Sequence, residues 1–402
     1  MSRGTGVAGG GEQTAVRQTR PPPWRDVRII RVVAQVVFLV AVFFFLRFLF
    51  TTLMTNMRAS GLPTGFAFLD QPTGFDIRGA DDFRPSQPIR DALLVGYANT
   101  IRVAAIGIAL ATVVGVLLGI ARLSTNWLVR KAAAVYVEAI RNTPVLLIIA
   151  FMYFAVVLAA LPGIADAVNV FGAMILSTRG IWMVWGEATQ PLGPFLAVLG
   201  VGLAVAVALG VWRTRLWDET GTPHHRVLWG AGALLLIGGV GYVALGAPIE
   251  VTLPTREGRL VTGGIELQPT YGALLAGLVI YTASHIAEIV RGSILAVPKG
   301  QTEAAQAIAL SGFQRMRYVI LPQAARIAVP PVASQYLNLT KNSSLAIFVG
   351  YVELTRVTFT AIGNANPAPQ LVAILALGYL TLSLFISAIA NVVNRSLALK
   401  AR

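Results

Sequence analysis

Long apolar windows recur along this sequence and restrict its possible folds more than any other feature. A transmembrane helix needs about 20 predominantly apolar residues. Hydrophobic residues make up 55% of the 402 positions and only 12% are charged, about half the charged share of a soluble protein. The sequence therefore predicts an all-α polytopic membrane protein. Its eight expected spans lie near residues 31–52, 93–120, 144–161, 192–212, 227–247, 270–291, 328–350 and 369–391.

Lysines and arginines between the windows predict the orientation of the chain. With the N-terminus inside, most of these residues fall in inner segments, so both termini are expected to be cytoplasmic. The formal net charge of +14 is then a topology signal, and nucleic acid is not needed as a partner. Residues 1–28 are rich in Gly, Pro and Arg, lack the apolar run of a signal peptide, and are interpreted as a disordered cytoplasmic tail.

Several catalytic chemistries lack the residues that they need. The chain has no cysteine, which excludes disulfides, thiolate metal sites and cysteine nucleophiles. The stretch His285–Ile289 reads HIAEI and lacks the second histidine of the HExxH zinc-protease motif, so no metal site is predicted. No convincing nucleophile–base pair for an intramembrane hydrolase is present, and no catalytic residue is predicted. No GxxxxGK[ST] loop occurs, so this chain is not expected to hold an ATP site.

A basic, alanine-rich segment separates the sixth and seventh windows on the predicted inner side. Residues 303–316 combine helix-forming residues with a small apolar face, and Gly312 is expected to interrupt this helix. Leu321 is expected to form a turn with Pro322, because proline disfavours helical backbone in the residue before it. The helix either lies on lipid headgroups or docks against another protein, whose surface could approach the small side chains closely.

The wider sequence around this segment resembles one family of transporters. Glu303-Ala304-Ala305, followed by Val319-Ile320-Leu321-Pro322, closely resembles the signature loop of ABC-importer permeases. The resemblance to polar amino-acid permeases of the histidine/glutamine type covers roughly 91–161 and 270–395, with the motifs in the expected order. The stretches that carry it are 96–124, 136–154, 281–331 and 338–354.

In that family the signature loop is a coupling helix that inserts into a groove of a cytoplasmic ATPase. The resemblance implies that this chain is the transmembrane channel subunit of an ATP-driven importer of L-amino acids in the bacterial inner membrane. The family usually has glycine where this chain has Ala309, and Gly312 could supply the helix bend instead. The implied ATPase-coupling residues are Glu303, Ala304, Ala305, Ala309, Gly312, Leu321 and Pro322.

The resemblance also implies the partners of the chain. They are a cytoplasmic ABC ATPase dimer, a periplasmic amino-acid-binding protein, an L-amino acid substrate, membrane lipid and a second, homologous permease subunit. The second subunit is expected to be unlike this one, because long forms resemble the permeases of broad-specificity importers that work as heterodimers. This chain would carry no cofactor, and ATP and Mg would belong to the partner ATPase.

The implied architecture is a type I ABC importer permease fold, with a five-helix core, one extra N-terminal helix and two inserted helices. After the tail, residues 29–90 would form the extra first helix and a periplasmic segment. Residues 91–161 and 269–402 would form the two parts of the core, with the coupling helix near 300–322. Residues 162–268 would form periplasmic loops and the two inserted helices.

Polar side chains inside the predicted spans are the candidates for a substrate pathway, because ionisable groups at membrane depth are costly. In the seventh window a polar run follows two prolines. It either lines the pathway at a discontinuous helix, where Lys341 could meet a substrate carboxylate, or forms hydrogen bonds between helices. The candidates in this run are Asn338, Lys341, Asn342, Ser343 and Ser344.

Other candidates lie in three further spans. Glu288 in the sixth window either pairs with a substrate amino group or forms an intrahelical ion pair with Arg291, while His285 joins the pathway or bonds to a neighbour. Asn142 and Thr143 either cap the third span, which is expected to begin at Pro144, or act as a gate. The fifth candidate outside the polar run is Arg102, inside the second window, which packing alone does not explain.

An ion-gradient-driven secondary amino-acid transporter is the alternative function. It would require inverted repeats and acidic residues near the midplane of the membrane, and this sequence shows few of either. It would also leave the alanine-rich segment without a role.

Overall fold

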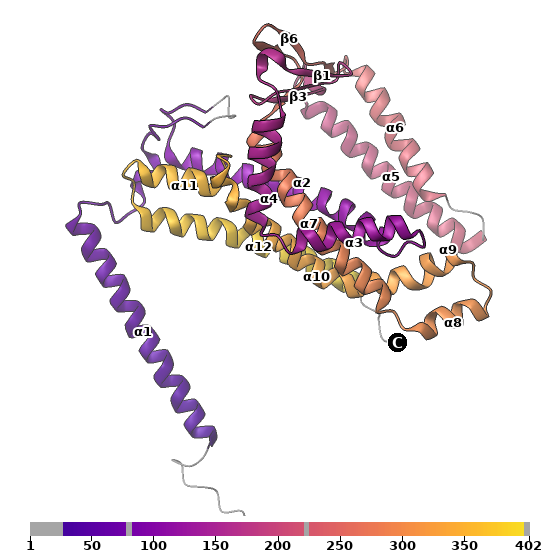
Figure 1. The fold of residues 1–402 in the computed structure, drawn as a ribbon, viewed down its shortest axis with the longest axis horizontal. Coiled ribbons are helices and arrows are strands. Elements are labelled where there is room, and N and C mark those ends of the chain that lie inside the picture. The colour runs from indigo at the N-terminus through magenta and orange to yellow at the C-terminus, as the bar shows by residue number, and fades with distance from the viewer. Residues whose placement is uncertain (1–26, 78–82, 221–224, 398–402) are drawn as a thin grey trace, which may run out of the picture. The chain divides into compact units, whose positions relative to one another are not determined.

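The computed structural model describes residues 27–77, 83–220 and 225–397 (Figure 1). Residues 1–26 of the predicted tail lie outside this part. The chain divides into two compact units, residues 1–68 and 69–402, which are described separately.

The first unit is dominated by a single helix, α1 (Val27–Ala59). Its most apolar window contains no buried residue, and large hydrophobic side chains such as Phe38, Phe43 and Phe50 are exposed. A helix that is apolar all round requires a protein core or lipid. The hydroxyls of Thr51 and Thr55 donate to carbonyls of the preceding turn, so their polar groups are satisfied within the helix.

The second unit is mainly helical, with several helices that change type along their length. The π-helical segments η2 and η4 continue α4 and α9, and the 3₁₀ segment η5 continues α10. In chain order the helical elements from η1 onward are η1 (Ala67–Asp70), α2 (Ile89–Ala121), α3 (Trp127–Arg141), α4 (Val145–Phe151), η2 (Met152–Leu158), η3 (Ile164–Asp166), α5 (Gly193–Thr220), α6 (Arg226–Ala244), α7 (Pro269–Leu295), α8 (Lys299–Ala307), α9 (Gly312–Arg315), η4 (Met316–Ile320), α10 (Leu321–Asn342), η5 (Ser343–Phe348), α11 (Leu354–Gly363) and α12 (Ala368–Leu397).

The predicted class of helical membrane protein is confirmed, but the predicted count of eight spans is not. In the described part of the chain, six helices are long and apolar enough to cross a membrane: α1, α2, α5, α6, α7 and α12. A seventh is present if α3 and the α4–η2 helix, which are bent by 105° at their junction, form one span. The window at 328–350 corresponds to α10 and η5 and does not meet this criterion.

A stripe of small residues brings α2 and α7 together, and this pair makes the most extensive contact in the fold. Gly107, Ala111, Gly115 and Gly119 follow one another at four-residue intervals along α2. A β-carbon at Gly115 would lie 2.7 Å from the β-carbon of Ile286. Such small-residue stripes let two helix backbones approach closely, as in packed membrane helices.

The hydrophobic core lies where α2, α4, α7 and α10 meet. Gly277 in α7 allows α4 to approach, because an added β-carbon would lie 2.9 Å from the α-carbon of Ile149. The largest fully buried members of this core are Val103, Ile149, Leu274, Leu278, Ile286 and Leu339.

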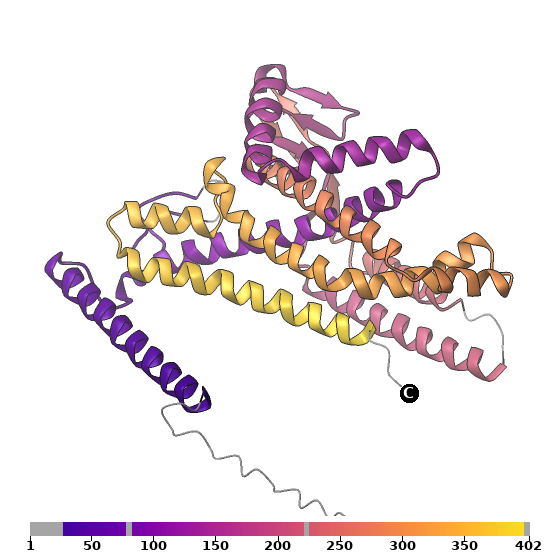
Figure 2. The same ribbon diagram turned by 60° about the horizontal axis from the view of Figure 1, so that its bottom comes forward.

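Short strands at one end of α7 form a small β region that the sequence did not predict (Figures 1 and 2). A four-stranded antiparallel sheet has the order β1-β2-β3-β8. A two-stranded ladder of β4 and β5 closes the base of the α5–α6 hairpin, with Trp185 opposite Thr252 and Ala188 opposite Ile249. A second two-stranded ladder joins β6 and β7. The strands are β1 (Val168–Val170), β2 (Met174–Leu176), β3 (Ile181–Met183), β4 (Trp185–Ala188), β5 (Ile249–Thr252), β6 (Thr255–Glu257), β7 (Leu260–Thr262) and β8 (Ile265–Leu267).

Candidate functional site

The predicted coupling segment, near residues 300–322, begins with α8. This helix is followed by a left-handed turn at Ala309. This residue has φ of 57°. Its N–H donates to the Gln306 carbonyl at 2.9 Å, and the Leu310 N–H donates to the Ala305 carbonyl at 3.1 Å. These two bonds form a Schellman motif, whose left-handed position is usually glycine. Alanine therefore occupies a glycine position here, at a cost of about 1–2 kcal/mol.

A capping box starts the next helix immediately after this turn. The Gln314 N–H donates to the Ser311 hydroxyl at 3.3 Å, and the Ser311 N–H donates to the Gln314 side chain at 2.9 Å. Gly312 is the first residue of α9. The prediction that Gly312 interrupts the helix is therefore wrong, because the break lies three residues earlier, where Ala309 adopts the left-handed conformation.

The turn predicted at Leu321-Pro322 is also wrong. The π-helical turn η4 leads directly into α10, and the Leu321 N–H donates to the Met316 carbonyl. Pro322 lies in the first turn of α10, where proline is tolerated because that N–H would lack a helical partner. The backbone is consequently helical from Gly312 to Asn342.

The surface of the coupling segment combines one acidic residue with exposed apolar side chains. Glu303, Ala304 and Pro322 are exposed, and Ile308 and Phe313 are exposed by 71% and 72%. In contrast, Ala305 is only 3% exposed, so it supports the segment from within.

Contacts behind this surface hold the segment against α10. The Gln323 side chain donates to the Gln301 side chain and to the Val319 carbonyl, each at 3.0 Å. Val297 packs with Ile320 and Ala324 in a small apolar cluster. The segment is therefore an anchored element of the fold.

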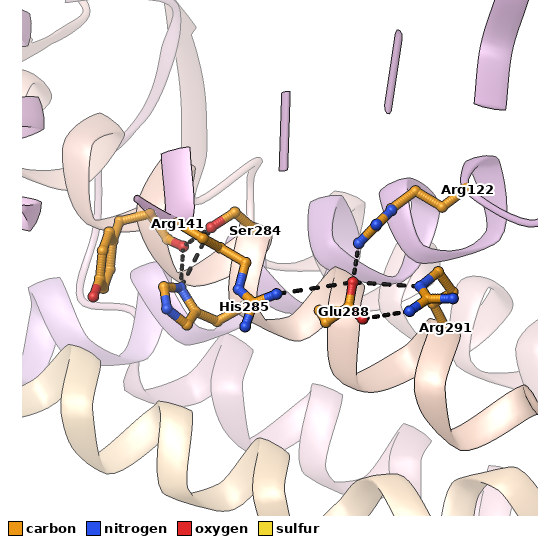
Figure 3. A network of polar contacts seen from close by, with 7 residues as sticks. Arg122, Arg141, Ser284, His285, Glu288 and Arg291 are labelled. Atoms are coloured by element: carbon orange, nitrogen blue, oxygen red, sulfur yellow. Dashed lines mark hydrogen bonds and ion pairs between the residues drawn. The ribbon is translucent and has the colours of Figure 1, made fainter. Parts of the chain in front are cut away.

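One carboxylate in α7, Glu288, gathers three arginines from three helices (Figure 3). Arg291, one turn later in α7, donates to it at 2.6 Å. Arg122 from the end of α2 forms a second ion pair, and Arg141 at the end of α3 lies 3.9 Å from the same carboxylate. The predicted ion pair with Arg291 is present, and it belongs to a larger group that ties α2, α3 and α7 together.

His285 stays outside this group. Its Nδ1 lies 3.1 Å from the Tyr281 carbonyl oxygen and 3.3 Å from the Ser284 hydroxyl. Because a carbonyl only accepts hydrogen bonds, Nδ1 is the protonated nitrogen. The bond to a neighbour that the sequence suggested is therefore the arrangement found.

The hydroxyl groups in the polar run of α10 bond to their own helix. Thr340 donates to the Tyr336 carbonyl at 2.9 Å, Ser343 to the Thr340 carbonyl at 2.7 Å, and Ser344 to the Lys341 carbonyl at 2.8 Å. The α-helix changes to 3₁₀ geometry at Ser343, so the run lies at a helix discontinuity, as predicted. Thr340 and Ser343 are fully buried.

The other polar side chains of the run are not buried, namely Asn338, Lys341 and Asn342. Their spacing of three and four residues places them on one face of α10. Asn338 and Lys341 are exposed, and none of the three side chains has a polar partner among the described residues. An ammonium group at membrane depth needs water or an anion, so this polar face of α10 is the candidate lining of a pathway.

The remaining predicted residues are dispersed. Arg102 in α2 is exposed and donates to the Asn99 side chain at 3.3 Å. Asn142 is the C-cap of α3, and the Thr143 hydroxyl donates to the Ala139 carbonyl at 2.9 Å. The prediction that they cap the following span is wrong, because both close the helix that precedes it. Within the described residues, no ion pair or hydrogen bond joins Arg102, the polar face of α10 and the Glu288 group.

Sequence reasoning missed Glu353, which is the most buried acid among the described residues. It is fully buried and caps α11 by accepting from the N–H groups of Thr355 and Arg356, at 2.8 and 3.2 Å. Its other oxygen accepts from the hydroxyls of Tyr379 in α12 and Thr100 in α2, at 2.7 and 3.1 Å. Burial raises the pKa of Glu353, and the hydrogen bonds from Tyr379, Thr355 and Arg356 partly oppose that rise. The only local signal in the sequence is a single acidic residue directly before a short helix. The side chains of Tyr379 and Thr100 that bind Glu353 are distant in sequence, so no local pattern connects them to it.

Comparison with known proteins connects these elements to a transport family. Residues 111–399 match the family described as binding-protein-dependent transport system inner membrane component. The chain belongs to this family. It is therefore a multi-span inner-membrane transport component, and the family assignment favours the importer over the gradient-driven alternative.

Full-length relatives agree with this assignment. The permease is 38% identical to the putative amino-acid ABC transporter permease protein YhdX of Escherichia coli, over 92% of this chain and 94% of that one. It is 40% identical to the general L-amino acid transport system permease protein AapQ of Rhizobium johnstonii, over 86% and 87% of the two chains. It also aligns with a crystal structure of an amino acid ABC transporter with histidines, at a TM-score of 0.45 and 17% identity, over 76% of this chain and 94% of that one.

Proposed function

We propose that this permease is the channel subunit of an ATP-driven importer that moves L-amino acids into the cytoplasm. The observation that carries the proposal is the similarity along almost the whole chain to permeases named for amino-acid transport, at 38% and 40% identity. A periplasmic amino-acid-binding protein would deliver the substrate. ATP and Mg would bind to a cytoplasmic ATPase dimer, where hydrolysis takes place.

The coupling segment supports a mechanical contact with that ATPase. Glu303, Ile308 and Phe313 offer one charge and two large apolar side chains to a partner surface. The Schellman motif and the capping box fix the backbone between them. A groove on the ATPase that combines a basic rim with an apolar floor would match this surface.

The helical backbone supports transmission from that contact to the pathway. From Gly312 to Asn342 the chain is helical without a break, a length of about 45 Å at 1.5 Å per residue. Displacement of α9 would therefore move the polar face of α10. Alternating access follows if this movement opens that face first to one side of the membrane and then to the other.

The polar face of α10 supports the proposed substrate class. Lys341 offers a cation to the carboxylate of an amino acid, and Asn338 and Asn342 offer amide groups beside it. An exposed polar face on one chain also suits a pathway completed by a second subunit. We infer that this subunit is a homologous but unlike permease, with both termini of each chain in the cytoplasm.

The test is ATP hydrolysis by the complex reconstituted in vesicles, with and without binding protein and a panel of amino acids. Glu303→Lys should abolish the amino-acid-stimulated rate while the variant still inserts in the membrane. Glu257→Lys is the matched control, because it reverses an exposed charge in the β6–β7 hairpin. Full stimulation in Glu303→Lys would contradict the coupling role, and stimulation by no amino acid would contradict the substrate class.

A further inference from the structure

A shallow hollow of about 370 Å³ lies on the α5–α6 hairpin, away from every group described above. It is found at the end of the hairpin opposite the β4–β5 ladder. Figures 1 and 2 agree that this end lies toward the same side of the second unit as α8 and α9. The hollow is lined by Val207, Gly210, Val211, Thr214, Arg215 and Arg226.

Two arginines from different helices, Arg215 and Arg226, place positive charge at one end of the hollow, which is called its mouth below. Arg215 lies near the end of the candidate span Gly193–Leu216, and Arg226 is the first residue of the span Arg226–Ala244. The lining contains no acidic residue, and neither guanidinium has a hydrogen-bond or ion-pair partner among the described residues. Two cations without a contacting carboxylate among the described residues, at the end of two membrane spans, favour an anion at the membrane surface.

The rest of the lining is apolar and follows α5 away from the charges. Val207 and Val211 form one wall, and Gly210 leaves space between the helices because an added β-carbon would meet no atom within 4 Å. The Thr214 hydroxyl is already used, since it donates to the Gly210 carbonyl at 2.8 Å. The hollow thus has a charged mouth and an apolar body, which matches an amphiphile better than a soluble anion.

Aromatic side chains beside the hollow place it at the membrane–water boundary. Trp212 and Trp229 are exposed by 56% and 54%, and the Arg213 guanidinium lies 5.3 Å from the ring centre of Trp229. Tryptophans are enriched at the level of the lipid headgroups. The two arginines of the mouth therefore lie at the depth of lipid phosphates.

We propose that this hollow is a binding site for one anionic phospholipid. The phosphate would bind between Arg215 and Arg226, and an acyl chain would lie along Val207, Gly210 and Val211. The lipid would contact the end of the α5–α6 hairpin that lies away from the β4–β5 ladder. The proposal is independent of the transported substrate and of the ATPase contact.

Native mass spectrometry of the purified full-length permease tests this site. The protein is titrated with dioleoyl phosphatidylglycerol, with dioleoyl phosphatidylethanolamine as the zwitterionic comparison. Each arginine contributes about fivefold to affinity for an anionic lipid surface, so Arg215→Gln/Arg226→Gln should bind phosphatidylglycerol about 30-fold more weakly. Gly210→Leu should weaken binding with no change in charge, because its side chain fills the apolar body.

Two controls separate the site from other sources of the same signal. Lys131→Gln/Arg395→Gln removes the same charge from exposed positions on α3 and α12 and should leave the affinity unchanged. Glycerol 3-phosphate, the headgroup phosphate without acyl chains, should not displace the lipid. Equal losses in the two double variants, unchanged binding in Gly210→Leu, or displacement by glycerol 3-phosphate would each overturn the proposal.

Discussion

The packing of α2 on α7 leads to a quantitative prediction for Gly115→Ala. The added methyl group would lie 2.7 Å from both the β-carbon and the γ2-carbon of Ile286, and 3.0 Å from the Ala283 carbonyl oxygen. Nonbonded carbon atoms prefer about 3.5–4.0 Å, so the two helices must separate by about 1 Å. Overpacking of this kind costs about 1–3 kcal/mol.

The identity of the clashing atoms predicts a graded series. At Gly115 and Gly119 the new methyl group meets the β-carbons of Ile286 and Val290, which are branched and cannot rotate away. At Gly107 its nearest neighbours are terminal methyl groups, those of Leu339 at 3.2 and 3.4 Å and one of Leu275 at 3.6 Å. Gly115→Ala and Gly119→Ala should therefore destabilise the fold, while Gly107→Ala should cost clearly less.

The assay is the midpoint of thermal unfolding of detergent-purified protein, read by fluorescence-detected size-exclusion chromatography. Gly232→Ala in α6 is the matched control, because its methyl group would meet no atom within 4 Å and alanine raises helix propensity by up to about 1 kcal/mol. The difference from this control isolates packing. If Gly115→Ala unfolds at the same temperature as Gly232→Ala, the close approach of the two helices is refuted.

Three further predictions concern single side chains. Burial raises the pKa of Glu353 above its usual 4.5, so the stability that this residue contributes should be complete below pH 4.5 and be lost as the pH rises through the raised pKa. Glu353→Gln should flatten this fall in melting temperature with pH. A pH profile of melting that is the same in the variant and the wild type would contradict the prediction. Glu288→Gln should cost about 1–3 kcal/mol in the same melting assay, since it leaves Arg122 and its neighbours without an anion, whereas Arg291→Gln should cost less because two arginines still balance the carboxylate. Ala309→Gly should preserve amino-acid-stimulated ATP hydrolysis and Ala309→Val should lose it, because a branched residue is strongly disfavoured at positive φ; equal rates in the two variants would show that the left-handed turn does not matter.

The sequence predicts those features that depend on local composition. The apolar windows coincide with helices such as α2, α5, α7 and α12, because a membrane span is encoded by a continuous run of residues. The helix discontinuity near Ser343 and the ion pair of Glu288 with Arg291 are likewise local, and both are present.

The features that escaped prediction depend on distant partners. The 105° bend between α3 and α4 is an angle set by packing, although Asn142 and Thr143 mark its position. The strands of the β region have only three or four residues each, and β3 pairs with β8 although the whole α5–α6 hairpin lies between them in the chain. Glu353 is satisfied by Thr100 and Tyr379, which no short pattern connects to it. The helix break was predicted at Gly312 and lies at Ala309, because a left-handed backbone is unusual for alanine.

The β4–β5 ladder has a consequence for how the chain could change its length. Because Ala188 is paired with Ile249, the segment between them, which contains α5 and α6, begins and ends at neighbouring points of the fold. This segment is therefore a single insertion. The entropic cost of closing such an insertion depends only weakly on its length. The two helices could be exchanged for a tight turn, or for a different domain, while the strand registers below stay as they are. The ladder is thus a natural splice point, at which the chain can gain or lose a module without rewriting the core.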